Sequence, residues 1–183
     1  MRKIIVVSIL LIVGLSLVWY TFPKTHSHTL QGVSYQLGNE EFVEKVTIKI
    51  DGKFKKSLTG ERTFKGTIDI EGEDIPVPLE ERTLELVFND NIFKDDYFAS
   101  IVYSSVKNAV PRLYSYGFIF INKDFTQLTI VKFNKDNGED FGGTWSAYDG
   151  LMITAPVDTR EQALSISNAL MSGFLEERGE TLE

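Results

Sequence analysis

Acidic side chains are the groups in this sequence best suited to chemistry, and they gather in two short segments. The first follows an alternating apolar stretch and the second is glycine-rich: Asp69, Glu71, Glu73 and Asp74, then Asp136, Glu139 and Asp140. Two carboxylates held together can act as general acid and base, and clustered oxygen ligands suit Ca²⁺. Neither segment has the ligand order of a calcium loop or an evident catalytic pairing. We interpret both as solvated turns and predict no catalytic residue, no cofactor and no metal site.

Histidine and cysteine narrow the chemistry further. The chain has 2 histidines, His26 and His28, and no cysteine, which excludes thiol nucleophiles, disulfides and thiolate metal sites. A Ser-His-Asp triad would need one of these histidines, which lie in a polar segment near the N-terminus. The pair could hold a transition metal only with further ligands. Nucleophile-elbow, phosphate-loop and dinucleotide-binding motifs are absent, so the sequence favours a non-enzyme.

Aromatic residues form the third candidate site. The stretch Leu113–Ile121 alternates, so its tyrosines and phenylalanines are expected on one face of a strand that is covered on both sides. With two aromatic residues from a later segment they make a candidate ligand or partner surface: Tyr114, Tyr116, Phe118, Trp145 and Tyr148. Aromatic side chains can line a ligand groove, but they also make good core residues. The alternative is that this face is core, packed under a helix.

Alternating apolar residues predict the strands that would position these groups. The clearest stretches are Val46–Ile50, Thr63–Ile70, Thr83–Phe88, Ala99–Ser104 and Leu151–Ala155. Asp-Gly pairs at 51–52 and 149–150 predict tight hairpin turns, because such turns need positive φ angles. Lys53–Leu58 and Ile75–Pro78 are expected at sheet edges, where a partner's strand could be added.

A single helix is predicted near the C-terminus. Asp158 and Glu161 have the spacing of a capping box. Ala163, Ile166 and Leu170 follow at helical spacing and make one apolar stripe. The predicted fold class is therefore α+β: a mostly antiparallel β-sheet with one C-terminal amphipathic helix packed on it.

The N-terminal stretch Ile4–Phe22 carries no charge and follows two basic residues. Its length and apolarity predict a transmembrane helix that anchors the protein in the cell membrane, with the N-terminus cytoplasmic and the remaining domain outside. Representative anchor residues are Ile4, Leu11, Leu15, Trp19 and Tyr20. The alternative is a cleaved signal peptide and a secreted protein, although no A-x-A-like site follows the stretch.

These elements divide the chain into three parts. We expect an anchor over residues 1–22, a polar linker over residues 23–34 and one extracytoplasmic α+β domain over residues 35–183. The formal net charge is −7, and an acidic surface does not favour nucleic acid, whose phosphates need Lys and Arg. The expected partners are the lipid bilayer, through residues 4–22, and another envelope protein or peptide.

Two segments carry a family resemblance. YQLGNEEFVEKVTIKIDGKF and TFKGTIDIEGEDIPVP resemble small uncharacterised membrane-anchored proteins of Bacillus-type Gram-positive bacteria. The resemblance implies an envelope location and no activity. We therefore expect a non-catalytic protein- or peptide-binding or accessory module. The alternatives are a ligand-sensing or substrate-binding domain that uses an aromatic groove, and an envelope hydrolase that works with two carboxylates.

Overall fold

The computed structural model describes residues 2–88, 97–107, 109–134 and 143–183. Three α-helices, one short 3₁₀ helix and eight strands follow one another along the chain. In order they are α1 (Arg2–Thr21), β1 (Lys24–Gln36), β2 (Asn39–Lys56), β3 (Arg62–Ile70), η1 (Leu79–Glu81), β4 (Leu84–Phe88), β5 (Tyr97–Lys107), β6 (Val110–Ile121), β7 (Leu128–Lys132), β8 (Leu151–Ala155), α2 (Arg160–Leu170) and α3 (Ser172–Glu176).

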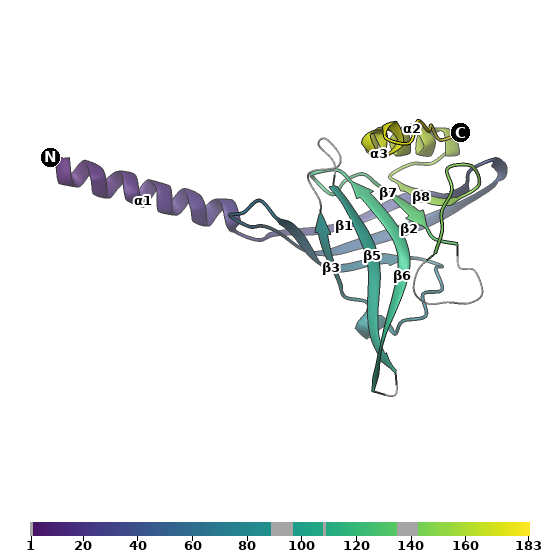
Figure 1. Ribbon diagram of the computed structural model, residues 1–183, viewed down its shortest axis with the longest axis horizontal. Helices are drawn as coiled ribbons and strands as arrows, with labels where there is room; N and C mark the ends of the chain where they lie inside the picture. Colours follow the sequence, from purple (N-terminus) through teal and green to yellow (C-terminus); the bar gives the residue numbers. More distant parts are fainter. Residues whose placement is uncertain (1, 89–96, 108, 135–142) are drawn as a thin grey trace.

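The strands form one antiparallel sheet in the order β4-β3-β2-β1-β8-β7-β6-β5. Strands β1 to β4 and β5 to β8 are two meanders, which the pairing of β1 with β8 joins. The sheet curls until its outer strands meet, as Figure 1 shows. The rings of Phe88 on β4 and Tyr97 on β5 lie 5.1 Å apart at this meeting. The predicted antiparallel sheet is confirmed.

Two apolar cores lie on opposite faces of the sheet because successive side chains of a strand point to opposite sides. The inner core fills the curl and contains Ile50, Phe64 and Ile119. The outer core lies under α2 and α3 and contains Met152 and Leu170. Helix α2 packs on β1, β7 and β8, whereas Phe174 of α3 packs against Phe98 of β5 and Phe120 of β6. The sheet thus uses both faces, and its helices cover only a part of one.

Glycines explain why β2 continues through Asp51-Gly52, where a hairpin turn was predicted. Gly52 lies opposite Gly66 of β3, and a Cβ atom on Gly66 would meet the carbonyl oxygen of Asp51 and, at 2.5 Å, the Cα of Gly52. The two glycines let the strands approach closely. The turn instead lies at residues 58–60, where Gly60 has a φ of 94°. The prediction of a turn at 51–52 is therefore wrong.

The prediction that Lys53–Leu58 and Ile75–Pro78 are edge segments of the sheet is also wrong. Residues Lys53–Lys56 belong to β2, which is not an edge strand: all four pair with β3, and Lys53 and Phe54 also pair with β1. Residues 75–78 form no strand, and Ile75 and Val77 are buried. Neither segment has an open strand edge for a partner.

The C-terminal helix differs from its prediction in two ways. Its N-cap is Thr159, whose hydroxyl accepts from the backbone N–H of Gln162, so the cap lies one residue after Asp158. The helix is also interrupted at Met171, which separates α2 from α3. The predicted α+β class with one C-terminal helix is therefore wrong: the folded part is mostly sheet with short helices.

The N-terminal predictions need correction as well. Within the described part of the chain, no helix has the length and apolarity required to cross a membrane, so the transmembrane helix predicted for residues 4–22 is wrong. The segment 23–34, expected as a polar linker, supplies most of β1 instead. It reads as polar in sequence because one side of β1 faces solvent over its first half.

Candidate functional site

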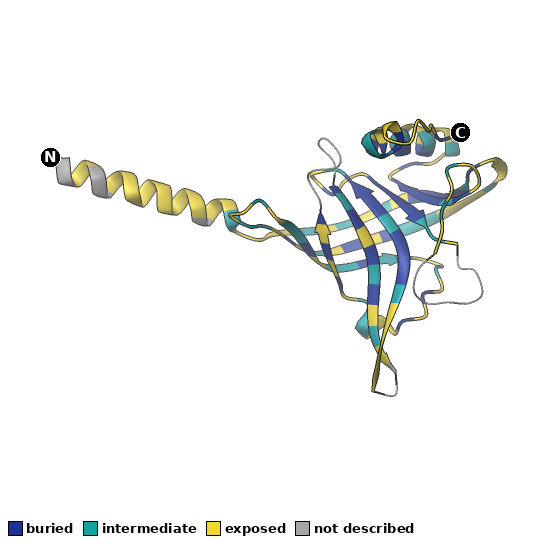
Figure 2. Cartoon of the chain, in the orientation of Figure 1, coloured by how far each residue is buried: buried dark blue, intermediate teal, exposed yellow. Residues whose placement is uncertain are grey.

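Helix α1 projects from the folded sheet and is exposed along most of its described length, as Figure 2 shows. Its exposed large apolar residues are Ile4, Ile5, Ile9, Leu10, Leu11, Ile12, Val13, Leu15, Leu17, Trp19 and Tyr20. They include all five residues predicted to form an anchor. Trp19 is 80% exposed. An apolar surface of this extent marks an interaction site.

A pocket lies where α1 joins the sheet. It has a volume of about 380 Å³ and lies over the outer face of β2, β3 and β4. Its lining is Pro23, Lys53, Lys55, Ser57, Glu61, Thr63, Lys65 and Glu85. We call it the basic pocket. Pro23 comes two residues after the end of α1, and the Nζ of Lys56 lies 4.7 Å from the ring centroid of Tyr20. The pocket and the exposed helix are therefore neighbours.

Strand register gathers the lysines of the basic pocket. Lys53 of β2 lies directly opposite Lys65 of β3, and Lys55 follows on the same outward face. The residue between them, Phe54, is buried in the inner core. Like charges directly opposite each other in a sheet are destabilising. Glu85 lies 3.7 Å from Lys65, but both side chains are largely exposed, so this ion pair contributes little.

Three more basic residues lie at the same end of the sheet but on the face opposite the pocket, because their side chains share the side of Phe54 and Phe64. Lys56 lies opposite Arg62, which is a second pair of like charges between β2 and β3, and Lys24 lies beside this end of β2 on β1. The guanidinium of Arg62 lies 5.1 Å from the ring centroid of Tyr97. We call the six residues together the basic surface: Lys24, Lys53, Lys55, Lys56, Arg62 and Lys65. The basic surface contrasts with a chain whose net charge is −7.

The sequence analysis missed the basic surface. The sequence assigns Lys53, Lys55 and Lys56 to an expected sheet edge and does not connect Arg62 and Lys65 with them. The signal that could have found the surface is the alternation of both segments together with a turn at Gly60 rather than at Gly52. That register places Lys53 opposite Lys65.

The aromatic surface predicted from alternation is divided between the two sheet faces. A β-bulge at Tyr116 places Gly117 opposite Ile101 and Ser115 opposite Val102. Because a bulge adds one residue to a strand, it reverses the faces that follow. Tyr114 and Tyr116 therefore pack with the inner core, whereas Phe118 packs with the outer core. The predicted single aromatic face of β6 is wrong.

Trp145 and Tyr148 lie together at a groove beside the C-terminal segment. The groove has a volume of about 730 Å³, and Tyr148 is 88% exposed. Its other lining residues are Gly38, Glu40, Ser146, Ala147, Arg160, Arg178, Gly179, Glu180, Thr181 and Glu183. The Nη2 of Arg160 donates to the backbone oxygen of Glu183 at 2.9 Å. The indole N–H of Trp145 and the Nε of Arg160 are buried and make no hydrogen bond to the described residues.

In the first acidic segment, Glu73 and Asp69 each form an ion pair. The Nζ of Lys132 donates to Glu73 at 2.6 Å, and their side chains are 29% and 15% exposed. Asp69 lies 3.8 Å from the guanidinium of Arg82. Both carboxylates are thus bound to cations within the fold. The second segment, which contains Asp136, Glu139 and Asp140, lies outside the described residues.

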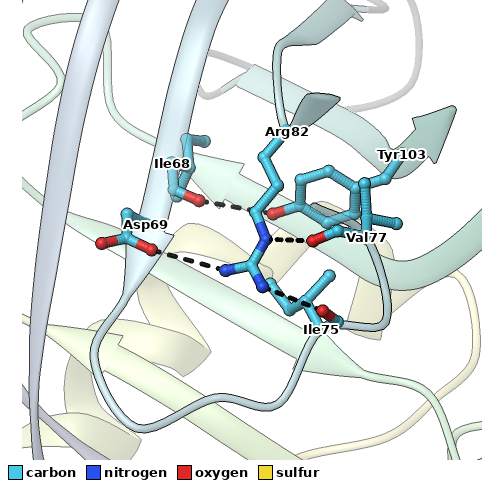
Figure 3. A network of polar contacts seen from close by, with 6 residues as sticks. All are labelled: Ile68, Asp69, Ile75, Val77, Arg82 and Tyr103. Carbon is cyan, nitrogen blue, oxygen red and sulfur yellow. Dashed lines mark hydrogen bonds and ion pairs between the residues drawn. The ribbon is translucent and has the colours of Figure 1, made fainter. Parts of the chain in front are cut away.

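Figure 3 shows the interactions of Arg82. Its Nε donates to the carbonyl of Val77 at 2.8 Å and its Nη2 to that of Ile75 at 2.9 Å. Nearby, the hydroxyl of Tyr103 donates to the carbonyl of Ile68 at 3.3 Å. Arg82 thus holds the segment 75–78 in place through the carbonyls of Ile75 and Val77. The arrangement is structural, since the guanidinium is only 17% exposed.

The histidine pair lies on β1. The ring of His26 stands 4.4 Å from that of Phe125 and 5.9 Å from that of His28. Burial, and then the charge of His28, lower the pKa of His26. Within the described ranges, no three His, Asp or Glu residues are placed to hold a metal ion.

Comparison with known proteins adds no assignment. No family model, no curated protein and no solved structure matches this chain. The evidence on function therefore comes from the exposed surfaces, pockets and charges of the described residues.

Proposed function

We propose that this protein is a non-catalytic binding module that associates with a lipid bilayer through the apolar side chains of α1. The single observation that carries the proposal is the exposure of eleven large apolar residues on one helix. The folded sheet would then present its surfaces to a protein or peptide partner.

The energy available from this helix supports the proposal. Burying one Leu or Ile side chain stabilises by about 1.5–3 kcal/mol. Burial of only four such residues would contribute about 6–12 kcal/mol before the entropy of association is subtracted. Trp19 and Tyr20 at the C-terminal end of α1 are the residue types that favour a boundary between apolar and polar surroundings. A lipid bilayer offers both an apolar interior for the Leu and Ile side chains and an apolar–polar boundary for Trp19 and Tyr20.

The contacts of the acidic side chains support a non-catalytic role. Glu73 and Asp69 each lie beside a cation, and Arg82 uses its donors on backbone carbonyls. These three side chains are therefore engaged in contacts within the fold, and no two carboxylates among them form an acid–base pair. Helix α1 offers a partner an apolar surface instead.

Vesicle flotation tests the proposal. The full chain is expected to float with vesicles of phosphatidylcholine, and Leu11→Lys/Leu15→Lys is expected to reduce the bound fraction at least tenfold, because two exposed apolar side chains of α1 are replaced. Leu58→Lys is the matched control, since Leu58 is 67% exposed in the turn after β2. A monodisperse full chain that does not float with these vesicles contradicts the proposal.

A second candidate function is the binding of a small ligand in the groove beside Trp145. The observation that favours it is the groove of about 730 Å³ with Tyr148, Arg160 and Arg178 in its lining. An aromatic carboxylate would fit this chemistry, because arginine binds carboxylates and aromatic rings stack. The chain has 2 tryptophans, so Trp19→Phe leaves Trp145 as the only indole. Its fluorescence should change saturably with phenylacetate, and an unchanged spectrum counts against this function.

A further inference from the structure

We propose that the basic pocket binds the phosphate of anionic lipid headgroups, an inference that rests on the proposed association of α1 with a bilayer. Lys53, Lys55 and Lys65 would supply the ammonium groups that contact the phosphate. The ligand is thus the headgroup of a lipid that lies beside the C-terminal end of α1.

Charge placement in the sheet is the first argument. Lys53 faces Lys65, and Lys56 faces Arg62, in the same pair of strands. Lys56 and Arg62 lie on the other face of the sheet. On the pocket face Lys53 and Lys65 repel each other, and the exposed Glu85 offsets this repulsion only weakly. A bound phosphate would convert this repulsion into attraction, since lysine ammonium groups are good phosphate ligands. The pocket volume of about 380 Å³ leaves room for a headgroup.

The second argument is the position of the pocket relative to α1. Pro23 lines the pocket directly after the helix, and Lys56 lies against the ring of Tyr20. When the apolar side chains of α1 contact lipid, the pocket lies at the boundary where phosphates are found. Lysine also suits this boundary, because its apolar stem can lie along lipid while its ammonium stays hydrated.

The third argument is the net charge of the residues outside the basic surface and the pocket. The chain has 19 basic and 26 acidic residues. Without the six residues of the basic surface and the two glutamates of the pocket, 13 basic and 24 acidic residues remain. An anionic membrane would repel this remainder and attract the basic surface. The field would therefore orient the molecule with the end of α1 toward the lipid.

Free phosphate would offer the lysines the same anionic group, but it brings no apolar surface to α1. Only a lipid brings the phosphate together with an apolar surface that covers α1. Clusters of four to eight basic residues beside a membrane-contacting helix are typical of binding to anionic lipid. We therefore commit to the lipid headgroup as the source of the phosphate.

The test compares two vesicle compositions with two matched variants of the full chain. Vesicles contain phosphatidylcholine alone or phosphatidylcholine with phosphatidylglycerol. Lys53→Gln/Lys55→Gln removes two charges from the pocket. Lys45→Gln/Lys49→Gln removes two charges from the same outward face of β2, with the centres of the two pairs roughly 23 Å apart along the strand. Flotation is measured at low and high salt.

The wild-type chain is expected to bind the anionic vesicles about tenfold more tightly than the neutral ones. High salt should remove the difference because it screens exposed charges. The pocket variant should lose most of the preference and keep its binding to neutral vesicles, whereas the control variant should keep both.

Four results would overturn the inference. Equal binding of both compositions by the wild-type chain, or an equal loss of preference in the two variants, refutes the pocket but leaves the association of α1 intact. Failure of the full chain to bind either vesicle refutes the proposed function and this inference together. Saturable NMR shifts of the pocket residues with inorganic phosphate, without any vesicle preference, would identify free phosphate as the ligand instead.

Discussion

The hydroxyl of Tyr35 on β1 lies 2.8 Å from the Oγ of Ser167 on α2, and both are buried. Thr129 of β7 and Thr154 of β8 complete a cluster of four hydroxyls around this contact, with Oγ1 atoms 2.9 and 2.8 Å from Ser167. Each hydroxyl can donate and accept, so the cluster satisfies itself without water. It joins α2 to three neighbouring strands at the centre of the sheet.

Loss of the Ser167 hydroxyl should therefore destabilise the fold. Ser167→Ala leaves buried hydroxyls of Tyr35, Thr129 and Thr154 short of a partner, and the expected loss is about 1–3 kcal/mol of unfolding free energy. Urea denaturation of the full chain measures it. Ser165→Ala is the matched control, because Ser165 is exposed on the same helix and the change in helix propensity is the same. An equal effect of both substitutions would contradict a role for the cluster.

The close approach of β2 and β3 predicts a second effect. Gly66→Ala places a Cβ against the backbone of Asp51 and Gly52, so the strands must separate and stability should fall by about 1–3 kcal/mol. Gly14→Ala on α1 is the contrast, because nothing lies within 4 Å of a Cβ there and alanine favours the helix. Thermal unfolding of both variants is the measurement. A Gly66→Ala variant as stable as the wild type would refute the steric argument.

Arg82 provides a third prediction. Arg82→Lys removes the planar group that reaches the carbonyls of Ile75 and Val77, and lysine cannot reproduce that geometry. Amide exchange of Ile75 and Val77, the two residues of this segment that carry a backbone N–H, should become at least tenfold faster, equivalent to about 1.4 kcal/mol or more. Asp69→Asn is the contrast, since its contact with Arg82 is 3.8 Å long and its side chain is 44% exposed. Equal exchange rates in the two variants would disprove the assignment.

Tyr116 predicts how stability depends on pH. Burial, and then the carboxylate of Glu73, raise the pKa of Tyr116. The folded protein therefore holds this proton above pH of about 10, where the unfolded chain releases it, and stability must fall as the pH rises. Burial raises the pKa of Tyr103 and of Tyr35 in the same direction. Unfolding free energy should thus decline steeply in alkaline solution.

The substitution Tyr116→Phe separates this contribution from the others. The Tyr116 hydroxyl is buried and makes no hydrogen bond to the described residues, so its removal should cost little at neutral pH. The alkaline decline should become shallower. Urea denaturation between neutral pH and pH of about 11 measures both. An unchanged alkaline slope would show that Tyr116 does not titrate in this range.

Local patterns were enough to predict most strands. Thr63–Ile70, Thr83–Phe88 and Leu151–Ala155 correspond closely to β3, β4 and β8, because alternation of apolar residues is a property of the strand itself. The same holds for the apolar character of Ile4–Phe22, which α1 exposes. The absence of cysteine likewise excludes thiol chemistry from sequence alone.

Register and curvature belong to the tertiary structure. Asp51-Gly52 has the composition of a turn, yet it continues β2 because Gly66 faces it across the sheet. The bulge at Tyr116 sends Phe118 to the other face, and no local pattern marks it. The basic surface exists only because pairing of β2 with β3 brings Lys53 and Lys65 together. Local sequence determines which segments are strands, whereas packing between distant segments decides which side chains share a face.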